Sequence, residues 1–227
     1  MDLRSVTGQD ADDLISISDG GKNHYLMPEV AAAWRLFQAK ASDAGFNAII
    51  VSAYRNFDRQ LAIWNAKALG QRKVLDDSGS AVNMAVLSDI DKVHAIMRYT
   101  ALPGASRHHW GTDIDIVDTS LMDENYSVQL TVAETCNDGV CAAFYSWLDG
   151  YQHDAEYQFK RPYSVDTGGI AVEPWHLSHR GTVAPFETAL TPALVKAAIS
   201  EQDLVLKATV LANFDELYER YIGVRNT

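Results

Sequence analysis

The chain has 227 residues, of which 47% are hydrophobic and 22% charged. This composition excludes collagen, low-complexity disorder and a disulfide-stapled miniprotein, and the length is sufficient for a hydrophobic core. The 19 Lys and Arg against 30 Asp and Glu give a formal net charge of −11, which is poorly matched to the phosphates of nucleic acid and to anionic membrane surfaces. We therefore expect no nucleic-acid partner, and the lack of an apolar run of about 18 residues predicts no membrane insertion.

Regular elements are predicted in the first part of the chain. A helix is expected over 28–44, because Pro28 suits a first helical turn, apolar residues recur at helical spacing and a glycine follows. The apolar segment 47–54 is typical of a buried strand, and a second helix is expected over 57–69. The polar segment 71–86 is expected to be a loop or mobile flap.

Shorter elements follow in the middle of the chain. Ser88, with Asp91 three residues later, resembles a capping box and predicts a helix that ends near residue 99. Strands are expected over 111–117 and 170–172, and a helix is expected over 141–151.

After residue 180 the pattern becomes strongly helical. Helices are expected over 190–200 and 203–221, and they carry no cluster of chemically reactive residues. We therefore predict a core domain over residues 1–180 and a helical C-terminal extension over 181–227 packed on that core. Because helices and strands do not alternate regularly, the predicted fold class is α+β.

Two features bear on the cellular compartment without deciding it. The N-terminal residues lack a basic segment followed by an apolar one, which leaves open a cytoplasmic protein or a protein whose signal peptide has been removed. Cys136 and Cys141 flank an Asn-Asp-Gly turn. They are either two unpaired thiols or a small disulfide, which would need an oxidising compartment.

Four of the seven histidines lie in two short segments, 106–116 and 173–179. Both segments also carry carboxylates, and imidazole with carboxylate is a usual ligand set of catalytic zinc. The alternative is a strand with buried histidines and surface acids. In the second segment, Pro174 biases Glu173 away from the helical conformation, which excludes the helical His-Glu-x-x-His motif. A strand end followed by a turn can still direct Glu173 and His176 into one cleft.

An extended conformation of the first segment sorts its side chains by face. Asp113 and Asp115 would then face a cleft, while the isoleucines next to them face the core. His108 lies seven residues before Asp115, so a straight strand would place these two on opposite faces. A bend at Gly111 could bring them together.

Three separated motifs resemble those of the VanY/VanX-type D-alanyl-D-alanine carboxypeptidases, also called LAS metallopeptidases, and they occur in the same order. They are Ser-x-Tyr-Arg over 52–55, Ser-x-His-x-x-Gly-x-Asp-x-Asp over 106–115 and Glu-x-Trp-His over 173–176. The second motif departs from the family signature at Asp113, where the signature has alanine. In addition, Gln60 falls where many members have a glutamine.

The resemblance implies a role for each matched residue. His108, Asp115 and His176 would bind Zn²⁺. Glu173 would be the general base, and Arg55 would hold the scissile carbonyl and its developing oxyanion.

The same resemblance implies that Ser106 and Gln60 bind substrate. Asp113 is expected near the metal either as a partner of a ligand or as a group that attracts the ammonium of a substrate, and we count it with the substrate-binding residues. Two further histidines get structural interpretations. His109 would point away from its neighbouring ligand, and His179 is expected beside the site or at the surface, since three protein ligands suffice for a catalytic zinc.

The fold implied by the resemblance is a small, mostly antiparallel sheet with helices packed on it and a zinc site in a cleft, as in the LAS peptidases and the hedgehog signalling domain. The implied activity is a D-alanyl-D-alanine carboxypeptidase acting on a peptidoglycan stem peptide or precursor. The alternatives are a peptidoglycan endopeptidase, cutting an L-Ala-D-Glu or cross-link bond, and a non-catalytic zinc-binding module. Glu173 and Arg55 favour an enzyme over the latter, because a binding module needs neither a base nor an oxyanion donor. Such a substrate implies the bacterial envelope, hence a periplasmic protein, and we expect a monomer.

Overall fold

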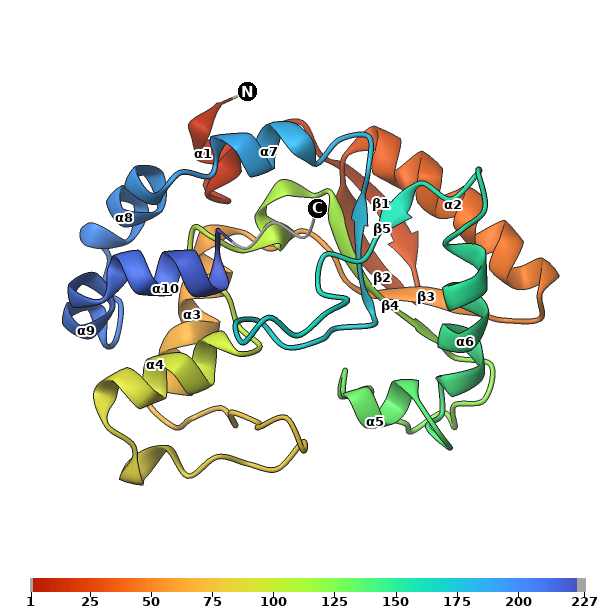
Figure 1. Cartoon of the computed structure of the whole chain (residues 1–227). Coiled ribbons are helices and arrows are strands. Elements are labelled where there is room, and N and C mark those ends of the chain that lie inside the picture. Colours follow the sequence, from red (N-terminus) through yellow and green to blue (C-terminus); the bar gives the residue numbers. More distant parts are fainter. Residues whose placement is uncertain (1, 224–227) are drawn as a thin grey trace.

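A four-stranded antiparallel sheet in the order β3-β4-β6-β5 lies at the centre of the computed structural model, which describes residues 2–223 (Figure 1). Its strands are β3 (Ala48–Ser52), β4 (Asp113–Asp118), β5 (Phe159–Lys160) and β6 (His176–His179). A separate hairpin consists of β1 (Ile15–Asp19) and β2 (Lys22–Leu26). The mixed architecture and the antiparallel pairing confirm the predicted α+β class.

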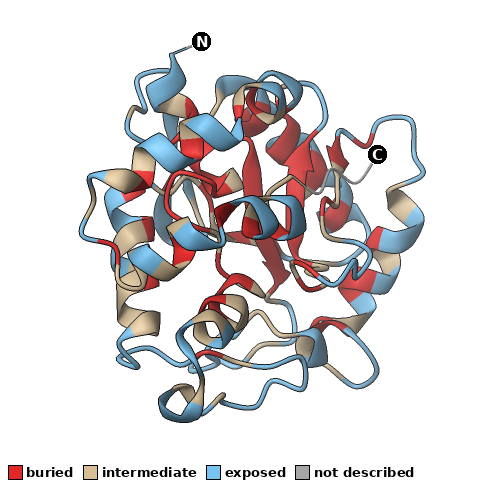
Figure 2. Cartoon of the chain, turned by 60° about the vertical axis from the view of Figure 1, so that its left-hand side comes forward, coloured by how far each residue is buried: buried red, intermediate tan, exposed pale blue. Residues whose placement is uncertain are grey.

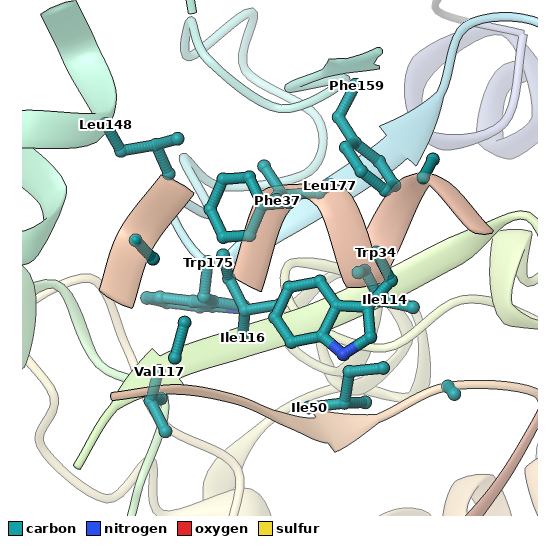
Figure 3. Packing of buried hydrophobic residues seen from close by; sticks show 14 of the residues in the cluster. Trp34, Phe37, Ile50, Ile114, Ile116, Val117, Leu148, Phe159, Trp175 and Leu177 are labelled. Atoms are coloured by element: carbon teal, nitrogen blue, oxygen red, sulfur yellow. The ribbon is translucent and has the colours of Figure 1, made fainter. Parts of the chain in front are cut away.

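The first hydrophobic core lies between the sheet and the two helices α2 (Pro28–Asp43) and α6 (Ala142–Tyr151). Trp34 and Phe37 of α2 project onto the sheet, where they meet Ile114 and Ile116 of β4 (Figure 3). All four side chains are at most 2% exposed. Burial of side chains of this size contributes about 1.5–3 kcal/mol each, so this contact fixes the face of β4 that turns away from the helices.

A second hydrophobic core lies among helices on the other side of the molecule (Figure 1). Those helices are α3 (Phe57–Ala68), α4 (Asp89–Met97), α7 (Ala184–Ala189), α8 (Pro192–Ser200), α9 (Lys207–Ala212) and α10 (Phe214–Tyr221). Trp64 and Ile96, from α3 and α4, share this core with Val195 and Phe214. Figure 2 shows the buried residues gathered on the strands and on the inward faces of the helices. The C-terminal helices thus pack on residues far earlier in the chain.

The remaining elements are short. They are α1 (Leu3–Val6), α5 (Val132–Thr135) and the 3₁₀ turns η1 (Met84–Val86) and η2 (Arg107–Trp110). The long segment between α3 and α4 is a loop, as predicted, with only η1 and an isolated bridge in it. None of the helices within residues 2–223 is long and apolar enough to cross a membrane.

The structure differs from the predicted elements in several places. The strand expected over 170–172 is wrong, since Ala171 donates its N–H to the carbonyl of Arg98 and joins no ladder. The helix expected over 203–221 is divided at Asn213 into α9 and α10. The β1–β2 hairpin was not expected, although the Gly-Gly pair at Gly20 is a hairpin-turn signal.

Cys136 and Cys141 are unpaired in this structure. Cys136 is exposed, whereas Cys141 is buried at the start of α6 and its thiol contacts the carbonyl of Asp118. Of the two possibilities left open by the sequence, the two free thiols are the one observed. The thiols therefore give no support to an oxidising compartment.

Candidate metal centre and active site

The sheet brings a row of polar side chains to the face opposite the first core. Ile114 and Ile116 are buried against α2, so Asp113 and Asp115, which alternate with them on β4, face the other way. Across the antiparallel register, Asp115 pairs with Ser52 of β3 and with His176 of β6. Strand pairing therefore places side chains from three distant parts of the sequence side by side.

The turn η2 adds His108 to this row. It ends at Gly111, which has a left-handed φ of +65°, a conformation that glycine adopts without steric cost. The bend expected at Gly111 is present, and it brings His108 Nε2 to 3.2 Å from Asp115 Oδ2. The main chain of η2 is also hydrogen-bonded to the segment that follows β3, because Arg55 donates its N–H to the carbonyl of His108.

Three buried side chains converge on one point. His108, Asp115 and His176 each offer a ligand atom, and these atoms lie within 4.8 Å of one another. The Nδ1 atom of His176 lies 3.2 Å from Asp115 Oδ1, a carboxylate oxygen that is buried without a hydrogen-bond partner among the described residues. Bonds of 2.0–2.2 Å around a tetrahedral Zn²⁺ would separate ligand atoms by about 3.3 Å. The donor set and its spacing therefore fit zinc.

Each imidazole is held from its far side. His108 Nδ1 lies 2.9 Å from the carbonyl of Ala53, and His176 Nε2 lies 2.9 Å from Asp113 Oδ1. Both acceptors lack a hydrogen, so in neutral rings the N–H is on these nitrogens. The lone pairs of His108 Nε2 and His176 Nδ1 then face Asp115, as metal binding requires.

Without metal, the pKa values of Asp115 and His176 depart from their usual values. Burial raises the pKa of Asp115, but the charges of His108 and His176 outweigh it and hold that pKa well below its usual range. For His176, burial lowers the pKa, yet the carboxylates of Asp113, Asp115 and Glu173 around the ring raise it well above its usual value. A proton and a cation therefore compete for His176 in this negatively charged setting.

Glu173 and Arg55 border the same site. Glu173 Oε2 lies 3.5 Å from His176 Nδ1, and its side chain is 13% exposed. The Arg55 guanidinium donates to Gln60 Oε1 at 2.7 Å and to Ser52 Oγ at 3.3 Å. Burial lowers the pKa of Arg55, while the charges of Asp115 and Glu173 raise it. A fixed cation and a carboxylate thus flank the three ligand atoms.

The residues expected to bind substrate lie around the site but are enclosed. Gln60 has no exposed surface, and its amide bridges Arg55 and the carbonyl of Ala101. Asp113 likewise has no exposed surface and binds His176. These contacts support Gln60 as a partner of Arg55 and Asp113 as a partner of His176, the latter being one of the two roles expected for Asp113. Contact of either side chain with substrate stays a prediction. Ser106 is 3% exposed and immediately precedes η2.

Neither additional histidine joins the ligand group that the described residues form. His109 Nδ1 lies 2.6 Å from the carbonyl of Arg55, and its Nε2 accepts the N–H of Gly104. Burial lowers its pKa to about 3, so it is a neutral structural residue. His179 Nδ1 lies 3.1 Å from Thr182 Oγ1, and its ring packs edge-on against Phe159.

Two residues near the site were not found from the sequence. Lys67 of α3 donates to Thr100 Oγ1 at 2.5 Å, and burial together with the charges of Arg72 and Arg55 lowers its pKa to about 8. Its position seven residues after Gln60, on the same helix face, was an available signal. Tyr163 packs its ring edge against His176, with centroids 5.0 Å apart, and no sequence pattern indicated it.

A family model described as VanY: D-alanyl-D-alanine carboxypeptidase matches residues 23–182. Two uncharacterised proteins of Haemophilus influenzae are also similar. One is 38% identical over 98 residues, covering 43% of this chain and 67% of its own length. The other is 24% identical over 123 residues, covering 53% of this chain and 92% of its own length.

Solved structures share the fold. A vancomycin-resistance D,D-pentapeptidase VanY, crystallised as a mutant with Zn(II), is 21% identical with a TM-score of 0.51, and the match covers 84% of this chain and 90% of that one. The LD-carboxypeptidase LdcB is 23% identical with a TM-score of 0.50, covering 94% and 80%. The fold that the motifs implied is therefore confirmed. Because the VanY model spans most of the chain and contains all the motifs from residue 52 to 176, this protein belongs to the VanY D-alanyl-D-alanine carboxypeptidase family and is a peptidase.

Proposed function

We propose that this protein is a zinc-dependent D,D-carboxypeptidase that removes the terminal D-alanine from the D-Ala-D-Ala end of a peptidoglycan stem peptide or its precursor. The observation that carries the proposal is the convergence of His108, Asp115 and His176 between a carboxylate, Glu173, and a guanidinium, Arg55. The family match supports the same activity. A related VanYB enzyme of similar fold was solved with D-alanine-D-alanine, at 21% identity and a TM-score of 0.51, covering 89% of each chain.

His108, Asp115 and His176 would hold the zinc ion, leaving one position open for water or substrate. The chemistry that zinc supplies when bound is a water made acidic enough to ionise near neutral pH. Glu173, 3.5 Å from a ligand nitrogen, accepts the proton of the attacking water and delivers it to the departing amine of D-alanine. Such general acid–base transfer contributes about 10²–10⁴ in rate.

Arg55 stabilises the negative charge that develops on the scissile carbonyl oxygen. Its guanidinium is held by Gln60 and Ser52, so it does not have to reorganise as the charge appears. Removal of a fixed donor of this kind costs about 10²–10³ in rate.

Lys67 provides a second cation for the substrate. It lies close enough to Arg55 and Glu173 to interact with both electrostatically. A carboxypeptidase must recognise a free terminal carboxylate, whereas an endopeptidase meets an amide at that position. A half-buried cation within electrostatic range of the base therefore favours the carboxypeptidase over the endopeptidase. A peptidoglycan substrate supports a location in the bacterial envelope, hence the periplasm.

The test combines metal analysis with product analysis. Zinc per chain is measured by elemental analysis, and D-alanine release is measured on a pentapeptide ending in D-Ala-D-Ala. Wild type is compared with Glu173→Gln and, as a matched control, with Glu219→Gln at an exposed position of α10. We expect about one zinc in all three proteins, and release reduced at least 100-fold in Glu173→Gln alone. Zinc without release by wild type would contradict the carboxypeptidase activity, and cleavage of cross-linked muropeptides would then identify an endopeptidase.

A further inference from the structure

Asp113 is a buried carboxylate surrounded by four side chains. It accepts hydrogen bonds from Arg107 Nε at 2.7 Å, Thr112 Oγ1 at 2.6 Å and Ser178 Oγ at 3.2 Å, and its Oδ1 lies 2.9 Å from His176 Nε2. We propose that Asp113 is a positioning residue of the metal centre, which fixes the tautomer and ring orientation of His176 and increases its strength as a ligand. Arg107, which donates to Asp113 Oδ1, holds the carboxylate in place for this role.

The ring of His176 shows why this contact matters. Its Nδ1 faces Asp115 at 3.2 Å, and its Nε2 contacts Asp113. The ring also makes T-shaped contacts with His108, with centroids 4.9 Å apart, and with Tyr163, with centroids 5.0 Å apart. These ring contacts limit tilting, but the imidazole could still rotate by half a turn about its Cβ–Cγ bond, which would put Cδ2 in the place of Nδ1 and Cε1 in the place of Nε2. Among residues 2–223, the hydrogen bond to Asp113 is the contact that distinguishes the two orientations on the Nε2 side.

The charge of Asp113 is compensated within the protein. Arg107 has only 13% of its side chain exposed, and besides Asp113 it binds Glu187 at 3.0 Å and Ser178 Oγ at 2.8 Å. A guanidinium held by three partners remains opposite Asp113. An ionised acceptor makes the hydrogen bond from His176 charge-assisted, and it increases the electron density at Nδ1.

Arg107 and Asp113 are close in sequence to two of the proposed ligands. Arg107 directly precedes His108, and Asp113 lies two residues before Asp115 on the same strand. Both members of the ion pair are therefore positioned by the same elements that position the ligands. An ion pair that served packing alone would have no need to engage the ring nitrogen of His176.

The inference rests on the proposed zinc site, so its test measures zinc binding and does not depend on activity. Wild type and Asp113→Asn are freed of metal with a chelator, and the Kd for zinc is measured by competition with a chromogenic chelator. The matched control is Asp118→Asn, which changes another buried carboxylate of β4, one that caps Asn47 and Ser120 at the far end of the strand. We expect zinc binding to weaken about 10–100-fold in Asp113→Asn. The control should stay within threefold of wild type.

A second measurement uses wild type alone and does not depend on how well a variant folds. Nitrogen-15 NMR of the zinc-loaded protein reports which ring nitrogen carries hydrogen. The His176 resonances are assigned as those that disappear in a variant without this histidine. We expect the proton on Nε2 of His176. A proton on Nδ1, or equal zinc affinity in wild type and Asp113→Asn, would overturn the role of Asp113 while leaving the zinc site intact. A wild-type protein that binds no zinc would overturn the proposed function together with this inference.

Discussion

His108 and Asp115 are seven residues apart in the chain, yet His108 Nε2 lies 3.2 Å from Asp115 Oδ2. An odd separation would direct the two side chains to opposite faces of a continuous strand. The left-handed turn at Gly111 removes this conflict, because it separates the 3₁₀ turn that carries His108 from the strand that carries Asp115. One backbone conformation thus determines whether the metal site can form.

Gly111→Ala is expected to disrupt both the bend and its surroundings. A Cβ atom at this position would lie 2.5 Å from Leu14 Cδ2, in addition to the strain of about 1–2 kcal/mol that a side chain meets at positive φ. We expect the free energy of unfolding to fall by about 2–4 kcal/mol and the zinc affinity to fall with it. Urea denaturation and zinc titration measure the two effects.

Gly70→Ala is the control for that substitution. Gly70 has a φ of +70°, but an added Cβ would meet no described heavy atom within 4 Å. It should therefore show the strain alone, about 1–2 kcal/mol, with zinc affinity unchanged. If both variants bound zinc as tightly as wild type, the bend at Gly111 would not determine the metal site.

Gln60→Leu is expected to reduce catalysis through Arg55. The substitution removes the acceptor that fixes the guanidinium and leaves the carbonyl of Ala101 without its donor. We expect kcat to fall about tenfold or more with a smaller change in KM, and the free energy of unfolding to fall by about 1–3 kcal/mol. Asn65→Leu on the same helix removes two hydrogen bonds to the 203–205 segment. It should lose similar stability and keep kcat, and an equal loss of kcat in both variants would make Gln60 a structural residue only.

The stabilisation of the protein by zinc is expected to increase with pH. Without metal, His176 has a pKa above its ordinary value of about 6.5, because the neighbouring carboxylates of Asp113, Asp115 and Glu173 outweigh burial. Its protonation stabilises the metal-free fold below pH 6.5, and this stabilisation is lost as the pH rises through the folded-state pKa. Zinc must displace that proton, so the rise in Tm on adding zinc should be larger at pH 8 than at pH 6. Thermal scans with and without zinc measure this, with magnesium as the control cation, and a zinc effect that shrinks with pH would contradict the assignment.

Lys67→Met is expected to increase stability and to weaken substrate binding. Burial and the charges of Arg72 and Arg55 lower the pKa of Lys67 to about 8, so the folded protein holds this charge at a cost below pH 8. Between pH 8 and 10.5, Lys67 is neutral in the folded protein but still protonated in the unfolded chain. The free energy of unfolding of wild type therefore rises over this range until the cost has disappeared. We expect Lys67→Met to be more stable by about 1–3 kcal/mol at pH 7 and no more stable near pH 10.5.

The same variant should raise KM for a peptide with a free terminal carboxylate about tenfold, the effect of about 1.4 kcal/mol. Lys92→Met changes a lysine of α4 that pairs with Asp89 at the surface and should alter neither quantity. An unchanged KM in Lys67→Met would contradict a role of Lys67 in substrate binding. The carboxypeptidase activity itself would still be tested by the product analysis.

The helices were largely predictable because their signals are local. Pro28 begins α2, the Asn56 side chain caps α3, and Ser88 caps α4 through the N–H of Asp91. The strands were less predictable because pairing partners are distant in sequence. The expected strand over 170–172 fails for this reason, since the partner of β4 begins at His176, the residue that pairs with Asp115.

The sequence by itself indicated the family and, through it, the three candidate ligands, because the order and spacing of the residues in its three motifs are covalent properties of the chain. Only the tertiary structure decided what the neighbouring polar residues do. Gln60 was expected to contact substrate, and Asp113 either to be a partner of a ligand or to attract a substrate ammonium; in the structure both are fully buried and bind Arg55 and His176, respectively. The physical reason is that a side chain's role depends on which atoms face it, and strand register and core packing fix those neighbours.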